Sequence, residues 1–208
     1  MSKISLNQAG KRFNKDWIFS NLDFHFDQGQ QYAIIGNNGS GKSTLLQIIA
    51  GYGSLTKGKI EWEGHDASTI FQDISFAAPY LELVEEFTTL EQIHFHTQFK
   101  PLQKQLSMEG IVELIGLKNA ADKQIRYFSS GMKQRLKLAL SIFSDSPILL
   151  LDEPCSNLDK EGYELYHHLI ATYAMHKLII VGSNDTAEYQ FCKAQLNLMD
   201  FKSKQVTH

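Results

Sequence analysis

A glycine-rich segment, residues 36–43, has the residue types and spacing of a phosphate-binding loop. Its sequence, GNNGSGKS, follows a short apolar run at residues 33–35 and precedes helically spaced apolar residues at 45–49. Glycines let successive backbone N–H groups converge on phosphate oxygens, and the start of a helix adds positive partial charge. The ammonium of Lys42 is expected to reach the β- and γ-phosphates, and the hydroxyl of Ser43 to ligate Mg²⁺. The segment therefore predicts a nucleotide site formed by Gly36, Asn37, Asn38, Gly39, Ser40, Gly41, Lys42, Ser43 and Thr44.

Two acidic residues, Asp152 and Glu153, come directly after a second apolar run at residues 148–151. In α/β proteins, ligands bind at the carboxyl ends of the buried strands. A lone pair of acidic residues after a strand is often only the solvated start of a helix. Beside a phosphate loop, however, Asp152 suits a role in holding Mg²⁺ through water, and Glu153 is placed to polarise an attacking water.

A third apolar run, residues 178–181, stops abruptly at the small polar residues GSND. This pattern predicts a buried strand that delivers a polar tip to a cleft. The tip contains Asn184, and one interpretation is that Asn184 caps the helix expected over residues 186–191.

Composition restricts the class of protein. The chain has 208 residues, of which 43% are hydrophobic and 21% charged, and its formal net charge is -3. This balance argues against a general nucleic-acid binder, which is normally strongly basic. There is no apolar run of about 18 residues, no signal-peptide pattern at the start, and no metal or redox spacing between Cys155 and Cys192. We therefore expect a reduced, cytoplasmic protein.

The segment RYFSSGMKQRLKLALSIF, residues 126–143, resembles the signature segment of ATP-binding cassette (ABC) ATPases, usually written LSGGQ. Ser129 and Gly131 match that pattern, with Ser130 between them at the start of a predicted helix. The resemblance implies that these residues contact the γ-phosphate of a nucleotide held by a partner subunit. The free N–H groups and the dipole of a helix N-terminus favour such an anion.

The resemblance covers about residues 4–199 and implies an α/β fold. It consists of a phosphate-loop core with a mixed sheet, an antiparallel β-subdomain, and a helical subdomain at about 87–143 inserted in a single 1–208 domain. A capping box from Thr88 to Glu91 is predicted at the start of the insertion. Phe13 occupies the position of an aromatic residue that stacks on adenine, although core packing of Phe13 and stacking by Trp17 are alternatives. Residues 156–159 resemble the dimer-interface loop and end at Asp159.

Two positions depart from the family pattern. A glutamine usually ends the strand before the helical subdomain, but Pro79 stands at that position here, and Gln72 lies seven residues too early. A histidine usually contacts the γ-phosphate from the tip of the strand after the acidic pair, but this chain has Asn184. Asparagine can donate an amide hydrogen bond to phosphate, but it cannot become a cation or shuttle a proton.

The resemblance implies an ATP-hydrolysing motor subunit of an ABC transporter, acting through a separate membrane subunit on the inner face of the membrane. ATP and Mg²⁺ are the expected cofactors, the two departures suggest slow turnover, and no nucleic-acid partner is expected. Two identical or related cassettes would pack head to tail, one supplying Lys42, Ser43, Asp152 and Glu153 and the other Ser129, Ser130, Gly131 and Asp159.

The alternatives are a regulatory ATP-binding module with little hydrolysis and a soluble ABC ATPase without a transport role. The acidic residues Glu82, Glu85 and Glu86 form either a solvated face or a surface for partner choice.

Overall fold

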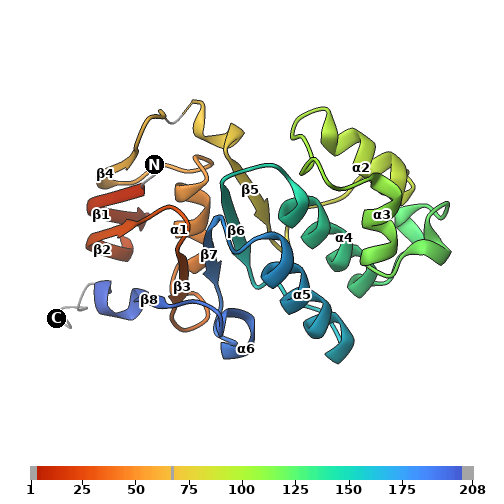
Figure 1. Cartoon of the computed structure of the whole chain (residues 1–208). Coiled ribbons are helices and arrows are strands. Elements are labelled where there is room, and N and C mark those ends of the chain that lie inside the picture. Colours follow the sequence, from red (N-terminus) through yellow and green to blue (C-terminus); the bar gives the residue numbers. More distant parts are fainter. Residues whose placement is uncertain (1–3, 67, 203–208) are drawn as a thin grey trace.

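The core of the protein is a parallel five-stranded sheet, seen in a computed structural model that describes residues 4–66 and 68–202 (Figure 1). The ends of the predicted 1–208 domain lie outside this part of the chain. The strand order is β5-β6-β7-β3-β8. The strands are β3 (Gln31–Ile35), β5 (Ile74–Ala77), β6 (Ile148–Asp152), β7 (Leu178–Gly182) and β8 (Ala194–Asn197).

The prediction of a mixed core sheet is wrong in one respect, because every pairing in this sheet of the described chain is parallel. The reason lies in the connections. Helical crossovers such as α5 (Lys160–Tyr173), between β6 and β7, return the chain to the same edge before each new strand starts. A separate antiparallel sheet has the order β2-β1-β4 and is made of β1 (Ile4–Phe13), β2 (Asp16–Phe26) and β4 (Lys57–Trp62).

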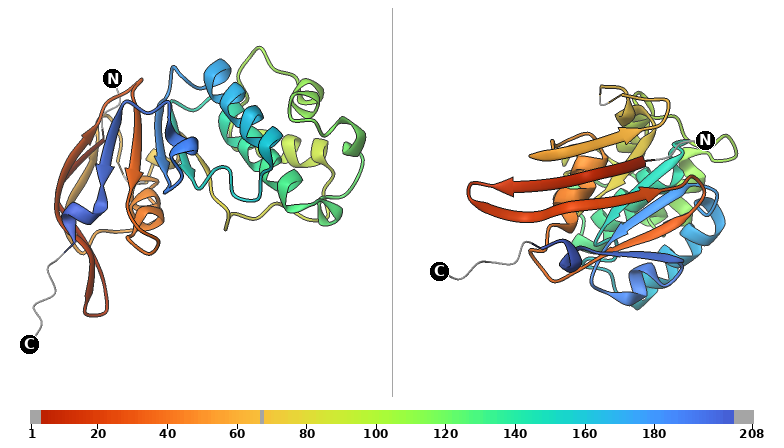
Figure 2. Two further views of the ribbon diagram at one scale, coloured as in Figure 1. Left: turned by 90° about the horizontal axis from the view of Figure 1, so that it is seen from below. Right: turned by 90° about the vertical axis from the view of Figure 1, so that its left-hand side faces the viewer.

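Alternate residues of the central strands feed two hydrophobic cores. Ile148 and Leu150 of β6 pack with α1 (Lys42–Ile49) and the antiparallel sheet, whereas Leu149 and Leu151 pack with the core that contains residues of α4 and α5. This alternation follows from the twofold period of a strand, and it explains why these runs are apolar throughout rather than alternating. Figure 2 shows the resulting layers, with the antiparallel sheet and α1 on one side of the parallel sheet and most of the other helices on its other side.

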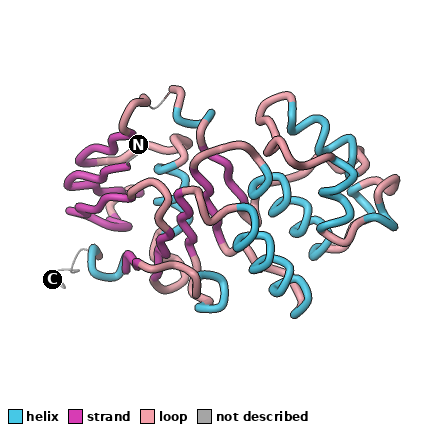
Figure 3. Tube along the Cα trace, viewed as in Figure 1, coloured by secondary structure: helices cyan, strands magenta, loops and turns pink. Residues whose placement is uncertain are grey.

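The predicted helical insertion contains three helices, α2 (Thr89–Thr97), α3 (Met108–Leu114) and α4 (Ser130–Phe143), which gather at one side of the molecule (Figure 3). The capping box is confirmed. The Thr88 side chain accepts a hydrogen bond from the backbone N–H of Glu91, and the Glu91 carboxylate accepts one from the backbone N–H of Thr88. The remaining short helical elements are α6 (Thr186–Tyr189) and the 3-10 turns Ile70–Gln72, Lys118–Ala120, Ile125–Tyr127 and Leu198–Phe201. Across residues 4–66 and 68–202, no helix is long and apolar enough to cross a membrane.

Candidate nucleotide site

The tips of three neighbouring strands meet at one edge of the parallel sheet. β7 lies between β6 and β3, with Gly182 in register with both Asp152 and Ile34. Backbone hydrogen bonds continue beyond the strands, from Glu153 N to Gly182 O at 3.0 Å and from Ser183 N to Ile34 O at 3.2 Å. The sheet therefore places the phosphate loop after β3, the acidic pair after β6 and the polar tip after β7 next to one another.

The phosphate loop closes around the Lys42 ammonium. Lys42 is 5% exposed, and its Nζ donates to Gly36 O at 2.9 Å and to Asn37 O at 3.4 Å. Gly41, at the start of α1, has a φ of 106°, and a Cβ there would lie 2.2 Å from Ile18 Cγ2. The sequence must therefore have glycine at this position, for both its backbone angle and its close packing.

Beside the loop lies a hollow of about 250 Å³, lined mainly by polar residues. It is lined by six of the predicted phosphate-loop residues together with the predicted catalytic carboxylate. The full lining is Ile18, Asn38, Gly39, Gly41, Lys42, Ser43, Thr44 and Glu153. Glu153 is exposed and has a φ of 44°, a left-handed conformation that is uncommon for a residue with a side chain. Such strained backbone occurs preferentially at functional sites.

Asp152 is a buried carboxylate with an unused oxygen. It is 2% exposed, and its Oδ1 has no hydrogen-bond partner. Burial raises the pKa of Asp152, whereas the Ser43 hydroxyl, which interacts with the carboxylate, lowers it. A buried carboxylate oxygen next to a hydroxyl fits Mg²⁺, which prefers oxygen ligands and binds few protein groups. The donor set therefore suits the metal expected at this edge of the sheet.

Asn184 contacts the phosphate loop directly. Its Nδ2 donates to the side-chain Oδ1 of Asn38 at 2.6 Å. The alternative role as a helix cap is wrong, because Asp185 is the residue that caps α6, accepting from Ala187 N at 2.9 Å. The helix is also shorter than expected and ends at Tyr189. A place in the γ-phosphate contact stays a prediction for Asn184, and the bond to Asn38 holds its side chain against the phosphate loop.

The residues of the signature segment lie elsewhere. Ser129 caps α4 by accepting from Met132 N at 3.2 Å, and both Ser129 and Ser130 are exposed. Asp159 caps α5 by accepting from Gly162 N at 2.9 Å. Neither they nor Gly131 line the hollow beside the phosphate loop in the described chain. This arrangement agrees with the expectation that these residues serve the nucleotide of another subunit.

The two aromatic candidates for adenine stacking differ in their surroundings. The guanidinium of Arg12 lies 5.4 Å from the Trp17 ring centroid, and a Cβ on Gly10 would lie 2.8 Å from the same indole ring. Phe13 is 52% exposed, so packing in the core does not account for it. The Lys11 Nζ lies 5.1 Å from the Phe13 ring centroid. Stacking on adenine stays a prediction for Phe13.

Tyr80 is a site residue that the sequence pattern did not indicate. The carbonyl of Pro79 accepts from Lys137 Nζ on α4 at 2.8 Å. The next residue, Tyr80, has a side chain that interacts with the Asp152 carboxylate. A single tyrosine in a loop carries no pattern in a sequence. The only feature of the sequence that could have indicated Tyr80 is its place directly after Pro79, the position at which this chain departs from the family pattern.

The comparisons with known proteins agree with this geometry. The family model of ABC transporters matches residues 19–156. The cytochrome c biogenesis ATP-binding export protein CcmA of Xanthomonas axonopodis pv. citri is 34% identical over 164 residues, covering 77% of this chain and 76% of the relative. ABC transporter I family member 1 of Arabidopsis thaliana is 33% identical over 186 residues, covering 86% of this chain and 80% of the relative.

Solved structures show the same fold. The dimeric structure of a post-hydrolysis state of the ATP-binding cassette MJ0796, bound to ADP and Pi, superimposes with a TM-score of 0.80 at 22% identity and covers 93% of each chain. The shared fold and the family match together account for the phosphate loop, the acidic pair and the signature segment. The chain therefore belongs to the ABC transporter family, as an ATP-binding and ATP-hydrolysing subunit.

Proposed function

We propose that this chain hydrolyses MgATP between two cassettes and thereby drives a separate membrane subunit. The observation that carries this proposal is the meeting of Lys42, Asp152, Glu153 and Asn184 at one edge of the parallel sheet. The separate strand ends supply a cation, a metal-binding carboxylate, a catalytic carboxylate and a neutral donor. These are the parts that phosphoryl transfer to water requires.

Each group has a distinct task in this proposal. Lys42 and the loop N–H groups hold the phosphates, and Ser43 with Asp152 holds Mg²⁺, which when bound neutralises charge on the β- and γ-phosphate oxygens. The exposed carboxylate of Glu153 orients and polarises the attacking water from the rim of the hollow. Phe13 provides an open ring for adenine.

In this proposal the Asn38–Asn184 pair offers neutral amide donors to the γ-phosphate. Each amide has two N–H donors, so the one shared bond leaves N–H groups on both residues for phosphate oxygens. A neutral pair involves no proton gain or loss, in contrast to an imidazole. We therefore propose that Asn184 contributes to turnover without titrating near neutral pH.

The second cassette follows from the position of the signature segment. Exposed Ser129 and Ser130 stand at the start of α4, a fourteen-residue helix whose free N–H groups favour an anion. They lie apart from the chain's own phosphate hollow, so a second copy or a related chain would complete each site. Gly131 and Asp159 are proposed to act from the same side of the interface.

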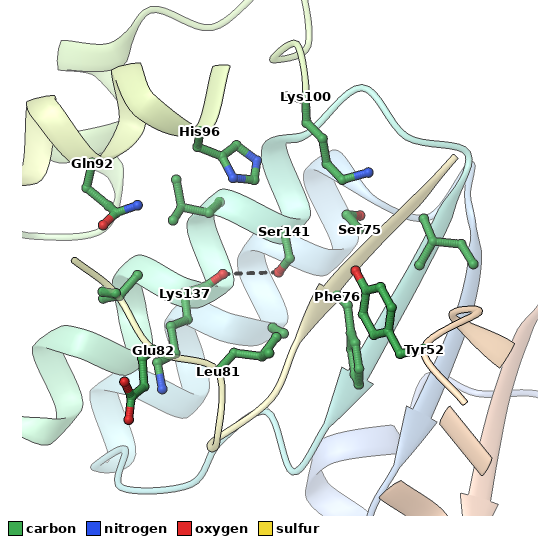
Figure 4. Close-up of a pocket in the computed structure, with 14 residues that line it drawn as sticks. Tyr52, Ser75, Phe76, Leu81, Glu82, Gln92, His96, Lys100, Lys137 and Ser141 are labelled. Atoms are coloured by element: carbon green, nitrogen blue, oxygen red, sulfur yellow. Dashed lines mark hydrogen bonds between the residues drawn. The ribbon is translucent and has the colours of Figure 1, made fainter. Parts of the chain in front are cut away.

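A cavity of about 230 Å³ between β5 and the helical insertion is the proposed contact for the membrane subunit (Figure 4). Its walls combine Phe76 and Leu81 with Lys100 and Lys137, and Glu82 lies beside Lys137. The other acidic residues of this loop are paired. Glu85 binds Lys133 at 2.6 Å and Glu86 binds Arg126 at 3.4 Å, so they fasten the loop to the segment that starts α4.

Export is the proposed direction of transport, because the Xanthomonas relative is an export protein.

Substitution of Lys42 tests the nucleotide site. Lys42→Ala removes a charged hydrogen-bond donor worth about 1.5–3 kcal/mol, so ATP affinity should fall roughly ten- to hundredfold. Calorimetric titration with a non-hydrolysable ATP analogue measures this affinity, and thermal unfolding confirms that the variant is folded. An unchanged affinity in a folded variant would remove the basis of the proposal.

A further inference from the structure

The loop that follows β5 makes a sharp turn before it enters the helical insertion. Leu81 N donates to Ala78 O at 3.2 Å, which closes a four-residue turn with Pro79 and Tyr80 at its centre. The Pro79 carbonyl is held by Lys137 on α4. The turn therefore fixes the starting point of the Tyr80 side chain with respect to both the sheet and the helical insertion.

The Tyr80 ring packs against the ring of Phe76 on β5. It lies edge-on to Phe76 with ring centroids 6.4 Å apart, and Phe76 in turn stacks with Tyr52 at 6.3 Å. From this position the Tyr80 hydroxyl interacts with the Asp152 carboxylate and with the side chain of Gln47 on α1. A phenol, whose usual pKa is about 10, keeps its proton at neutral pH and therefore remains a donor.

Asp152 needs an orienting donor of this kind. Its Oδ1 is buried without a hydrogen-bond partner, and its neighbours are the hydroxyls of Ser43 and Tyr80. Ser43 itself is expected to turn to the metal. Tyr80 is then the donor in this group that is free to keep the carboxylate in place when the metal binds.

We propose that Tyr80 is a positioning residue of the metal–nucleotide site, whose hydroxyl orients the Asp152 carboxylate so that Oδ1 serves the metal-bound water. The proposal rests on the proposed function. Pro79 lacks the polar side chain of the glutamine that the family usually has at that position. The Tyr80 phenol, one residue later in the same loop, would supply a polar group in its place. Groups that orient metal-binding carboxylates typically change metal affinity or activity by 10–100-fold when they are removed.

Tyr80→Phe is the direct test, because it removes the hydroxyl and keeps the ring against Phe76. The Mg²⁺ concentration for half-maximal ATPase activity should rise about ten- to hundredfold. Binding of a non-hydrolysable ATP analogue, measured by calorimetry, should weaken in Mg²⁺ but remain unchanged in EDTA. Tyr173→Phe is the matched control, since it removes a hydroxyl from a ring packed edge-on against Phe143, with centroids 5.0 Å apart and away from the site.

A second variant separates hydrogen bonding from packing. Tyr80→Gln returns an amide donor, so its Mg²⁺ requirement should stay below that of Tyr80→Phe. The same Mg²⁺ requirement in Tyr80→Phe and Tyr173→Phe would overturn the inference, as would equal weakening of analogue binding in Mg²⁺ and in EDTA. A requirement in Tyr80→Gln as high as in Tyr80→Phe would overturn the donor role. The Tyr80 variants test only the positioning role. Lys42→Ala tests the proposed function, which would fail if that variant bound ATP as tightly as the parent.

Discussion

At the scale of single residues, the site combines buried charge with neutral amides. Lys42 and Asp152 are almost fully buried, whereas Asn38 and Asn184 meet at the exposed rim. The pair at the rim can be formed without nucleotide, and its remaining N–H groups are available when a third phosphate arrives. Discrimination between ATP and ADP at this rim would therefore depend on hydrogen bonding more than on charge.

Asn184 gives the sharpest prediction at this scale. Asn184→Ala should lower ATPase turnover several-fold, because a neutral hydrogen bond is worth about 1 kcal/mol, and should leave ATP binding nearly intact. Asn184→His should preserve or raise turnover and add a pH dependence near the histidine pKa of about 6.5, which the parent should lack. Steady-state rates under saturating MgATP from pH 5.5 to 8.5 measure both effects. Equal turnover in the parent and in Asn184→Ala would show that the strand tip does not sense phosphate.

At the scale of elements, sequence pattern predicted the parts that depend on local chemistry. The apolar runs became β3, β6 and β7, and Thr88 and Glu91 formed their capping box, because strand periodicity and helix capping are local properties. Strand direction was not accessible in this way, since an apolar run does not show its orientation relative to its neighbour. The contact of Tyr80 with Asp152 was inaccessible for a similar reason. It depends on packing between residues 72 positions apart.

The helical insertion carries a pH-sensitive contact of its own. His96 on α2 lies 2.8 Å from the Ser144 hydroxyl, which donates its only proton to Leu140 O at 2.6 Å. The His96 Nε2 must therefore carry a proton and donate it to the Ser144 hydroxyl. Burial, with a smaller contribution from the charge of Lys100, lowers the His96 pKa to about 4.

The consequence is a loss of stability in acid. Between the usual histidine pKa of about 6.5 and the folded-state value of about 4, the unfolded chain binds a proton that the folded chain does not. The contribution of neutral His96 to the free energy of unfolding is thus fully present above pH 6.5. It is lost as the pH falls toward 4, and the loss is at most about 3 kcal/mol. Urea unfolding of the parent and of His96→Gln at pH 7.5, 6 and 5 should show a shallower decline in the variant. Identical declines would assign the acid sensitivity to other groups.

At the scale of the whole molecule, the proposed nucleotide contacts fall on two separate parts of the chain. The hollow beside the phosphate loop and the exposed start of α4 belong to the same chain, yet the signature serines do not line that hollow. Two chains packed head to tail would join each hollow to the other chain's α4. ATP would then lie between them and contribute to the interface, and its hydrolysis would release the pair.

Glu153→Gln tests both the catalytic carboxylate and this assembly. The amide cannot accept a proton from water, so hydrolysis should slow by roughly 100-fold or more while ATP stays bound. The closed pair should then accumulate, because the step that releases it is blocked. Size-exclusion chromatography should show a dimer of Glu153→Gln with MgATP and monomer without nucleotide, whereas Lys42→Ala should remain monomeric under both conditions. If Glu153→Gln hydrolyses ATP at the parent rate, the assigned carboxylate is wrong. If it is slow but stays monomeric, the natural pair is formed with a different chain, and mixing with that chain should restore the dimer.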